Sequence, residues 1–123
     1  MILRDEEVNL RSNLPLWNGL IDYYVFLIDD RTVDHSEDTI RRILRSDETY
    51  VIAPFCFEGF GQARTEALQL AWEHFPAASH VLIADPDWRP DVATISKDDL
   101  HQSAETYEFT IFDRNGYTER TSN

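Results

Sequence analysis

The chain has 123 residues, of which 42% are hydrophobic and 28% are charged, so we expect one soluble globular domain with a single modest core. Eleven lysines and arginines stand against 23 aspartates and glutamates, and the net charge of -12 disfavours binding to nucleic acids. The longest apolar run, residues 23–28, is too short to span a membrane, and the acidic N-terminus has no signal-peptide core, so we expect a cytoplasmic location by default.

The first predicted elements alternate between strand and helix. Residues 1–3 are typical of the end of a strand, and Asp5 is placed to cap a helix that Pro15 breaks or restarts. The apolar run over residues 23–28 stops at Asp29, which is typical of a strand buried on both faces. The apolar face of the first helix consists of Leu10, Leu14 and Trp17.

The same alternation continues through the middle of the chain. Ser36 is placed to cap a second helix, and residues 50–53 predict a strand closed by Pro54. Residues 62–74 predict a third helix, and residues 80–84 predict another buried strand. The packed side of the second helix consists of Ile40, Ile43 and Leu44, and that of the third of Ala63, Ala67, Leu70 and Ala71. Trp17, Trp72 and Phe75 are expected in the core, and Cys56 is expected to be a buried small hydrophobe.

This order of elements favours an α/β fold with a mostly parallel, doubly wound sheet and helices on both faces. Residues 107–113 then predict a strand, Asn115-Gly116 a hairpin turn, and Tyr117-Thr118 a return strand that is cut short. A hairpin with one arm missing indicates a fragment of a longer domain. Because lost strands leave sheet edges unpaired, we expect marginal stability or self-association of the isolated chain.

Acidic side chains follow three of the predicted strands, where open α/β sheets bind their ligands. They are residues 5–7, residues 29–30, and the pair Asp85 and Asp87 around Pro86. For any one group, solvation of a loop end is the more ordinary explanation, but together on one rim they favour a divalent-metal site. Asp85 and Asp87 have the spacing to grip one Mg²⁺ or Mn²⁺ ion, with substrate phosphates as further ligands.

Four segments, in this order, resemble the family 2 glycosyltransferases of the GT-A fold. Residues 1–7, Met-Ile-Leu-Arg-Asp-Glu-Glu, are similar to that family's first strand running into Lys-Asn-Glu-Glu, and residues 29–34 to its Asp-x-Gly-Ser-Thr-Asp turn. Residues 60–68 are similar to its Phe-Ser-x-Ala-Arg-Asn-x-Ala-Leu helix, and residues 81–87 lie where the family has its Asp-x-Asp. The resemblance implies a nucleotide-sugar-binding half over residues 1–88 and the start of an acceptor side over residues 89–123.

The resemblance also implies roles for single residues. Asp29 would contact the nucleotide base, Glu6 would lie beside the base and ribose, and Arg64 would approach the diphosphate. Asp85 and Asp87 would hold Mn²⁺ or Mg²⁺ against the diphosphate of a nucleotide sugar, with a UDP-sugar favoured and the acceptor unknown.

Several alternatives stay open. Arg64 could instead pair with Asp34 or Glu66, and Arg31 stands where the family has glycine. The chain could be a truncated nucleotide-binding fragment without activity. A receiver-like phospho-acceptor domain is less favoured, because the single lysine, Lys97, follows Asp85 too closely. No catalytic base is assigned, since none of the downstream acids matches a motif; these are Asp98, Asp99, Glu105 and Glu108.

Overall fold

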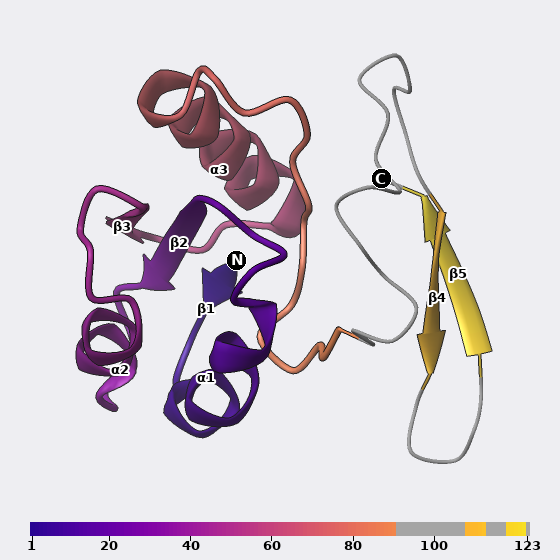
Figure 1. Cartoon of the computed structure of the whole chain (residues 1–123). Helices are drawn as coiled ribbons and strands as arrows, with labels where there is room; N and C mark the ends of the chain where they lie inside the picture. Colours follow the sequence, from indigo (N-terminus) through magenta and orange to yellow (C-terminus); the bar gives the residue numbers. More distant parts are fainter. Residues whose placement is uncertain (91–107, 113–117, 123) are drawn as a thin grey trace.

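The structure, a computed structural model, describes residues 1–90, 108–112 and 118–122. Its elements are β1 (Ile2–Leu3), α1 (Glu7–Asn13), the 3₁₀ helix η1 (Leu14–Trp17), β2 (Tyr24–Asp29), α2 (Ser36–Ile43), β3 (Tyr50–Phe55), α3 (Phe60–His74), β4 (Glu108–Phe112) and β5 (Thr118–Ser122). The strands β1, β2 and β3 form a parallel sheet in that order, with α1 and α2 on one face and α3 on the other (Figure 1). The predicted α/β class is therefore confirmed, whereas the GT-A identity of the sheet stays a prediction.

The central strand β2 is buried on both faces, as its apolar sequence predicts. Successive side chains of a strand point to opposite faces. Phe26 therefore packs with the core beneath α1 and α2, and Leu27 packs with the smaller core beneath α3. Both are almost completely buried, at 0% and 1% exposure. Burial on both faces explains why no polar residue interrupts the strand before Asp29.

The helices bury the sides that their spacing predicts. Leu10, Leu14 and Trp17 are all buried, although Pro15 follows α1 so closely that the chain tightens into η1. In α3, Ala63 is buried and Ala67 and Leu70 pack against the sheet. No helix in the described part of the chain is both long and apolar enough to cross a membrane.

Two predictions of buried side chains are wrong. Trp72 is 55% exposed, because it lies on the side of α3 that faces away from the sheet, whereas Phe75 is buried and stacks on Tyr23 with 4.6 Å between ring centroids. Cys56 is exposed because it lies in the loop directly after β3.

The strand β3 extends two residues beyond its predicted end and includes Pro54. The carbonyls of Thr49 and Phe55 accept hydrogen bonds from β2 or the turn that follows it, at 2.9 Å and 3.0 Å. In a parallel strand, alternate residues direct their backbone groups to one neighbour, so the ring nitrogen of Pro54 faces the outer edge. Because no ladder bond is lost there, proline does not end this strand.

The strand predicted over residues 80–84 does not form, which corrects the expected sheet. These residues are irregular and lie in the segment after α3, which runs past β1 on the side away from β2 (Figure 1). Since β1 is only two residues long, a further strand would find few backbone partners on that edge.

The hairpin near the end of the chain has two complete arms. β4 and β5 pair antiparallel from Phe112 opposite Thr118 to Glu108 opposite Ser122, so the expectation of a missing arm is wrong. The predicted turn at Asn115-Gly116 lies outside the described residues.

Candidate functional site at the carboxyl edge of the sheet

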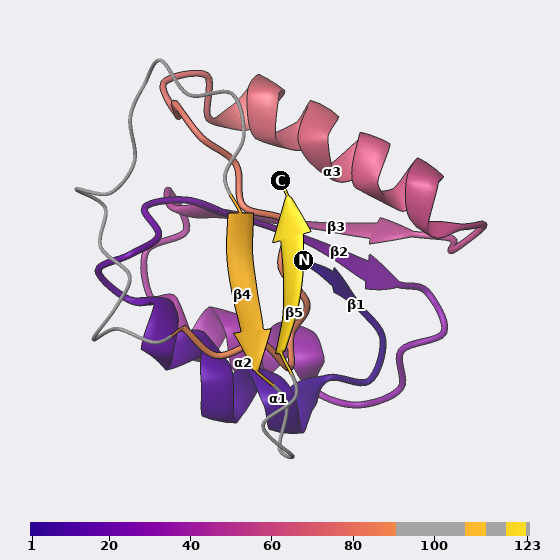
Figure 2. The same cartoon turned by 90° about the vertical axis from the view of Figure 1, so that its right-hand side faces the viewer.

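The three parallel strands end at one edge of the sheet, from which α3 begins. Figure 2 shows the arrowheads of β1, β2 and β3 pointing to this edge. The loop from β1 to α1 and the loop from β2 to α2 also lie there, because each connects a strand end to the start of the next helix. The carboxyl edge therefore gathers the segments around Glu6 and Asp29 with the start of the helix that contains Arg64.

Hydrogen bonds from Asp5, Asp34 and Ser36 join the first two loops, and we call this set the loop junction. One carboxylate oxygen of Asp5 accepts the N–H groups of Val33 at 2.8 Å and Asp34 at 3.2 Å. Asp5 has φ of 51°, a left-handed conformation that aspartate adopts more readily than most residues. Asp5 thus bridges two loops and does not cap α1, which corrects its predicted role.

Asp34, which is half-buried, and Ser36, which is buried, form the other half of the loop junction. The Asp34 carboxylate accepts the N–H of Glu7 at 3.0 Å, the N–H of Ser36 at 3.0 Å and the Ser36 hydroxyl at 2.5 Å. The Ser36 oxygen accepts the N–H of Glu6 at 3.0 Å. Ser36 is the first residue of α2 rather than its cap, a second correction, because its side chain serves the neighbouring loop. Burial would raise the pKa of Asp34, but these hydrogen bonds outweigh burial and lower it.

Asp29, the residue predicted to contact the nucleotide base, is hydrogen-bonded to Arg31. One carboxylate oxygen of Asp29 accepts the N–H of Arg31 at 2.9 Å and its Nε at 3.0 Å, and the other accepts Nη2 at 2.8 Å. Hydrogen bonds from the Arg31 side chain, followed by its backbone N–H, hold the pKa of Asp29 well below its ordinary value. Asp29 is 3% exposed, so no part of its carboxylate is offered to a ligand in this arrangement.

Glu6 lies at the same edge, where both its backbone N–H and its side chain are hydrogen-bonded. Its backbone N–H is bound by Ser36, and its side chain accepts the Asn9 amide at 2.7 Å. The second bond directs the Glu6 carboxylate along α1.

Arg64 is exposed on α3, near the end of the helix that lies at the carboxyl edge. Its guanidinium carbon lies 5.9 Å from the centroid of the Phe60 ring. Within residues 1–90, no ion pair joins Arg64 to Asp34 or Glu66. The first turn of α3 has no acidic residue and no side-chain cap. Arg64 and the uncapped helix end thus present positive charge at this edge.

The structure does not bring Asp85 and Asp87 to the carboxyl edge. The carbonyl of Pro86, between them, accepts the Asn13 amide at 3.0 Å, at the far end of α1. Burial lowers the pKa of the Met1 ammonium to about 6, and the nearby Asp85 carboxylate partly offsets that effect. This ammonium donates to the carbonyl of Val25, about 13 Å before Asp29 along β2 at the usual rise per residue. The two acids therefore lie beside the beginning of the sheet.

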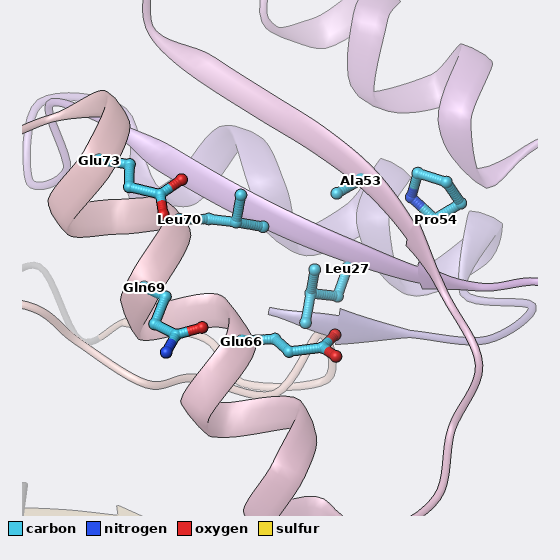
Figure 3. Close-up of a pocket in the computed structure, with 7 residues that line it drawn as sticks. All are labelled: Leu27, Ala53, Pro54, Glu66, Gln69, Leu70 and Glu73. Atoms are coloured by element: carbon cyan, nitrogen blue, oxygen red, sulfur yellow. The ribbon is translucent and has the colours of Figure 1, made fainter.

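No metal centre is assembled in the described part of the chain. Nowhere there do three or more histidine, cysteine, aspartate or glutamate side chains lie close enough together to hold an ion. A pocket of about 200 Å³ lies between α3, which carries Glu66 and Glu73, and the sheet, which carries Leu27 (Figure 3). None of the predicted site residues lines it; its lining consists of Leu27, Ala53, Pro54, Glu66, Gln69, Leu70 and Glu73.

The sequence reasoning noted Arg31 only as a departure from glycine and missed its pairing. The available signal was local: an aspartate that ends a strand, with an arginine two residues later, can form both a backbone turn and a bidentate pair. The loop junction had no such signal, because its partners lie about 30 residues apart.

In comparisons with known proteins, no family model, no curated protein and no solved structure matches the chain. The fold and the carboxyl edge therefore define an α/β protein with a parallel sheet.

Proposed function

We propose that this protein binds a nucleoside diphosphate sugar at the carboxyl edge of its sheet and transfers the sugar to an acceptor, as a glycosyltransferase. One observation supports the proposal most directly. Three segments that resemble family 2 glycosyltransferases are far apart in sequence, yet they meet at this edge: the β1–α1 loop with Glu6, the β2–α2 loop after Asp29, and the start of α3. Ligands of open α/β sheets bind at such an edge.

The charges at this edge suit a diphosphate better than the net charge of the chain suggests. Arg31 and Arg64 both present guanidinium groups there, and the first turn of α3 adds no carboxylate. Guanidinium groups match phosphate oxygens in geometry, and a helix N-terminus favours anions. A nucleotide would be held by these groups through its phosphates, and Glu6 would remain near its sugar or base.

The proposed metal is a separate part of the proposal. Asp85 and Asp87 supply the carboxylates that Mg²⁺ or Mn²⁺ prefers, and such an ion stabilises a leaving diphosphate. As placed, however, the two carboxylates lie beside the beginning of the sheet and do not form a site with Asp29 or Glu6. We therefore route no step of the reaction through the metal.

Calorimetric titration of UDP, and then GDP, into the full chain tests nucleotide binding. We expect binding by the wild type and a loss of about tenfold in affinity for Arg64→Ala, the size of one charge-assisted hydrogen bond. The matched control is Arg42→Ala, an exposed arginine at the far end of α2, which should change the affinity less than twofold. A chain that is folded by circular dichroism and binds neither nucleotide overturns the proposal.

Two further experiments test metal binding and catalysis separately. If the metal proposal holds, Mn²⁺ strengthens UDP binding and Asp85→Ala removes that gain; no gain from Mn²⁺ overturns the metal part alone. Release of UDP from UDP-glucose, with water as the acceptor, tests catalysis. UDP binding without such release favours the alternative, a nucleotide-binding domain that does not catalyse transfer.

A further inference from the structure

The guanidinium of Arg31 is fixed in place at the carboxyl edge by the Asp29 carboxylate. Asp29 accepts three hydrogen bonds from Arg31, and its side chain is buried. Two of them come from different nitrogens of one guanidinium, so both the position and the plane of the group are set. The third, from the backbone N–H of Arg31, fixes the turn from which the side chain starts.

The Arg31 side chain remains accessible despite this pairing. Its side chain is 53% exposed, whereas that of Asp29 is 4% exposed. A guanidinium has five N–H donors, and Asp29 uses two of them. The other three have no protein acceptor among the described residues, so they are available to an acceptor that arrives from solvent.

We infer that Arg31 binds the diphosphate of the ligand and that Asp29 is its positioning residue, rather than a contact to the nucleotide base. This inference rests on the proposed function, because it names the group that holds the ligand at that same site.

The arrangement favours recognition by geometry over recognition by net charge. The Asp29–Arg31 pair is neutral as a unit, and Asp30 adds a further negative charge beside it. A phosphate is therefore attracted mainly by the fixed N–H groups that remain on Arg31. Because Asp29 already restricts the arginine, little side-chain entropy is lost when a ligand binds.

The location agrees with a ligand that spans two loops. The N–H of Asp30 donates to the carbonyl of Phe55 at 3.0 Å, which ties this turn to the end of β3. Cys56 follows, and the loop then leads into α3. Arg31 is thus held beside the segment that leads to Arg64.

The test titrates inorganic pyrophosphate, UDP and uridine into the full chain in the presence of EDTA. For Arg31→Ala we expect the affinity for pyrophosphate and UDP to fall about tenfold. Any binding of uridine should be unchanged, because uridine has no phosphate. Arg31→Lys should recover only part of the loss, since an ammonium group cannot form the paired, planar hydrogen bonds with Asp29 that fix the guanidinium. Asp29→Asn should weaken UDP binding by about threefold through looser positioning of Arg31.

A second variant guards against a folding defect. Arg31→Ala leaves a buried carboxylate without a partner, which can unfold the chain. The double variant Asp29→Ala with Arg31→Ala removes both charges, and Arg42→Ala controls for the loss of one exposed arginine. If the wild type binds UDP and the folded double variant binds it equally well, the inference about Arg31 is wrong and the proposed function stands. If the wild type binds neither pyrophosphate nor UDP, both in EDTA and with Mn²⁺ in place of EDTA, the proposed function is overturned together with this inference.

Discussion

Replacing Asp34 by alanine should destabilise the protein, because it removes an acceptor that joins the two loops at the carboxyl edge. Asp34 accepts three hydrogen bonds: one from Glu7 and two from Ser36, which is completely buried. Each such bond contributes about 1 kcal/mol net, and an unpaired buried donor costs at least as much. Water can reach the N–H of Glu7 and recover part of its bond. We therefore expect the free energy of unfolding to fall by about 2–3 kcal/mol.

Urea unfolding followed by circular dichroism measures this change. Asp34→Asn keeps one acceptor oxygen and should cost about 1 kcal/mol. Asp47→Ala is the matched control, since Asp47 is exposed in a turn and should change the free energy by less than about 0.5 kcal/mol. An unfolding midpoint for Asp34→Ala equal to that of the control would show that the loop junction does not hold the two loops together.

The dependence on pH gives the same prediction an independent check. The folded pKa of Asp34 is lowered from its ordinary value of 3.8, so the native state binds its proton less readily than the unfolded chain. The stabilisation is therefore fully present above that ordinary value and is lost as the pH falls through the folded pKa. The difference in unfolding free energy between the wild type and Asp34→Ala should narrow in acid. A difference that stays constant down to the acid transition would contradict the assignment.

Three further predictions concern the sheet and its edge. Phe26→Ala should lower the free energy of unfolding by about 3–5 kcal/mol in urea titrations, because a fully buried ring is lost, whereas Val33→Ala at an exposed position should be nearly neutral. Pro54→Ala should change it by less than about 1 kcal/mol, since its nitrogen faces the outer edge; a larger loss would show that the proline ring packs in the core. Asp29→Asn should make stability fall less steeply than in the wild type as the pH drops below 3.8, measured by thermal unfolding at several acidic pH values, because the lowered pKa of Asp29 is then absent.

The predictions from sequence are correct for elements whose burial follows from the local spacing of their apolar residues. The apolar run that ends at Asp29 fits a strand buried on both faces, and Leu10, Leu14 and Trp17 share one face because of helical geometry. Residues 80–84 have an equally apolar sequence and form no strand. A strand needs a partner edge, and the short β1 offers little of one.

The candidate site was predictable in its location but less so in its contacts. That Glu6 and Asp29 lie at one edge follows from the topology of parallel strands. That Asp29 is fully bound by Arg31, and that Asp85 lies near Met1 instead, depends on side-chain pairing and on the path of a single irregular segment. Asp5 and Ser36 have the residue types of helix caps, but each found partners on the other loop.

The unequal lengths of the strand ladders bear on how the chain folds. Ile2 pairs with Leu27 and Tyr24 pairs with Tyr50, so the two crossovers enclose nearly the same length of chain and cost similar loop-closure entropy. The first closure pairs only two residues of β1 with β2, whereas the second pairs six residues of β3 with β2. Docking of β3 and α2 onto β2 should therefore precede docking of the N-terminal strand. In kinetic experiments, substitutions in β3 would slow folding, while substitutions at Ile2 or Leu3 would mainly speed unfolding.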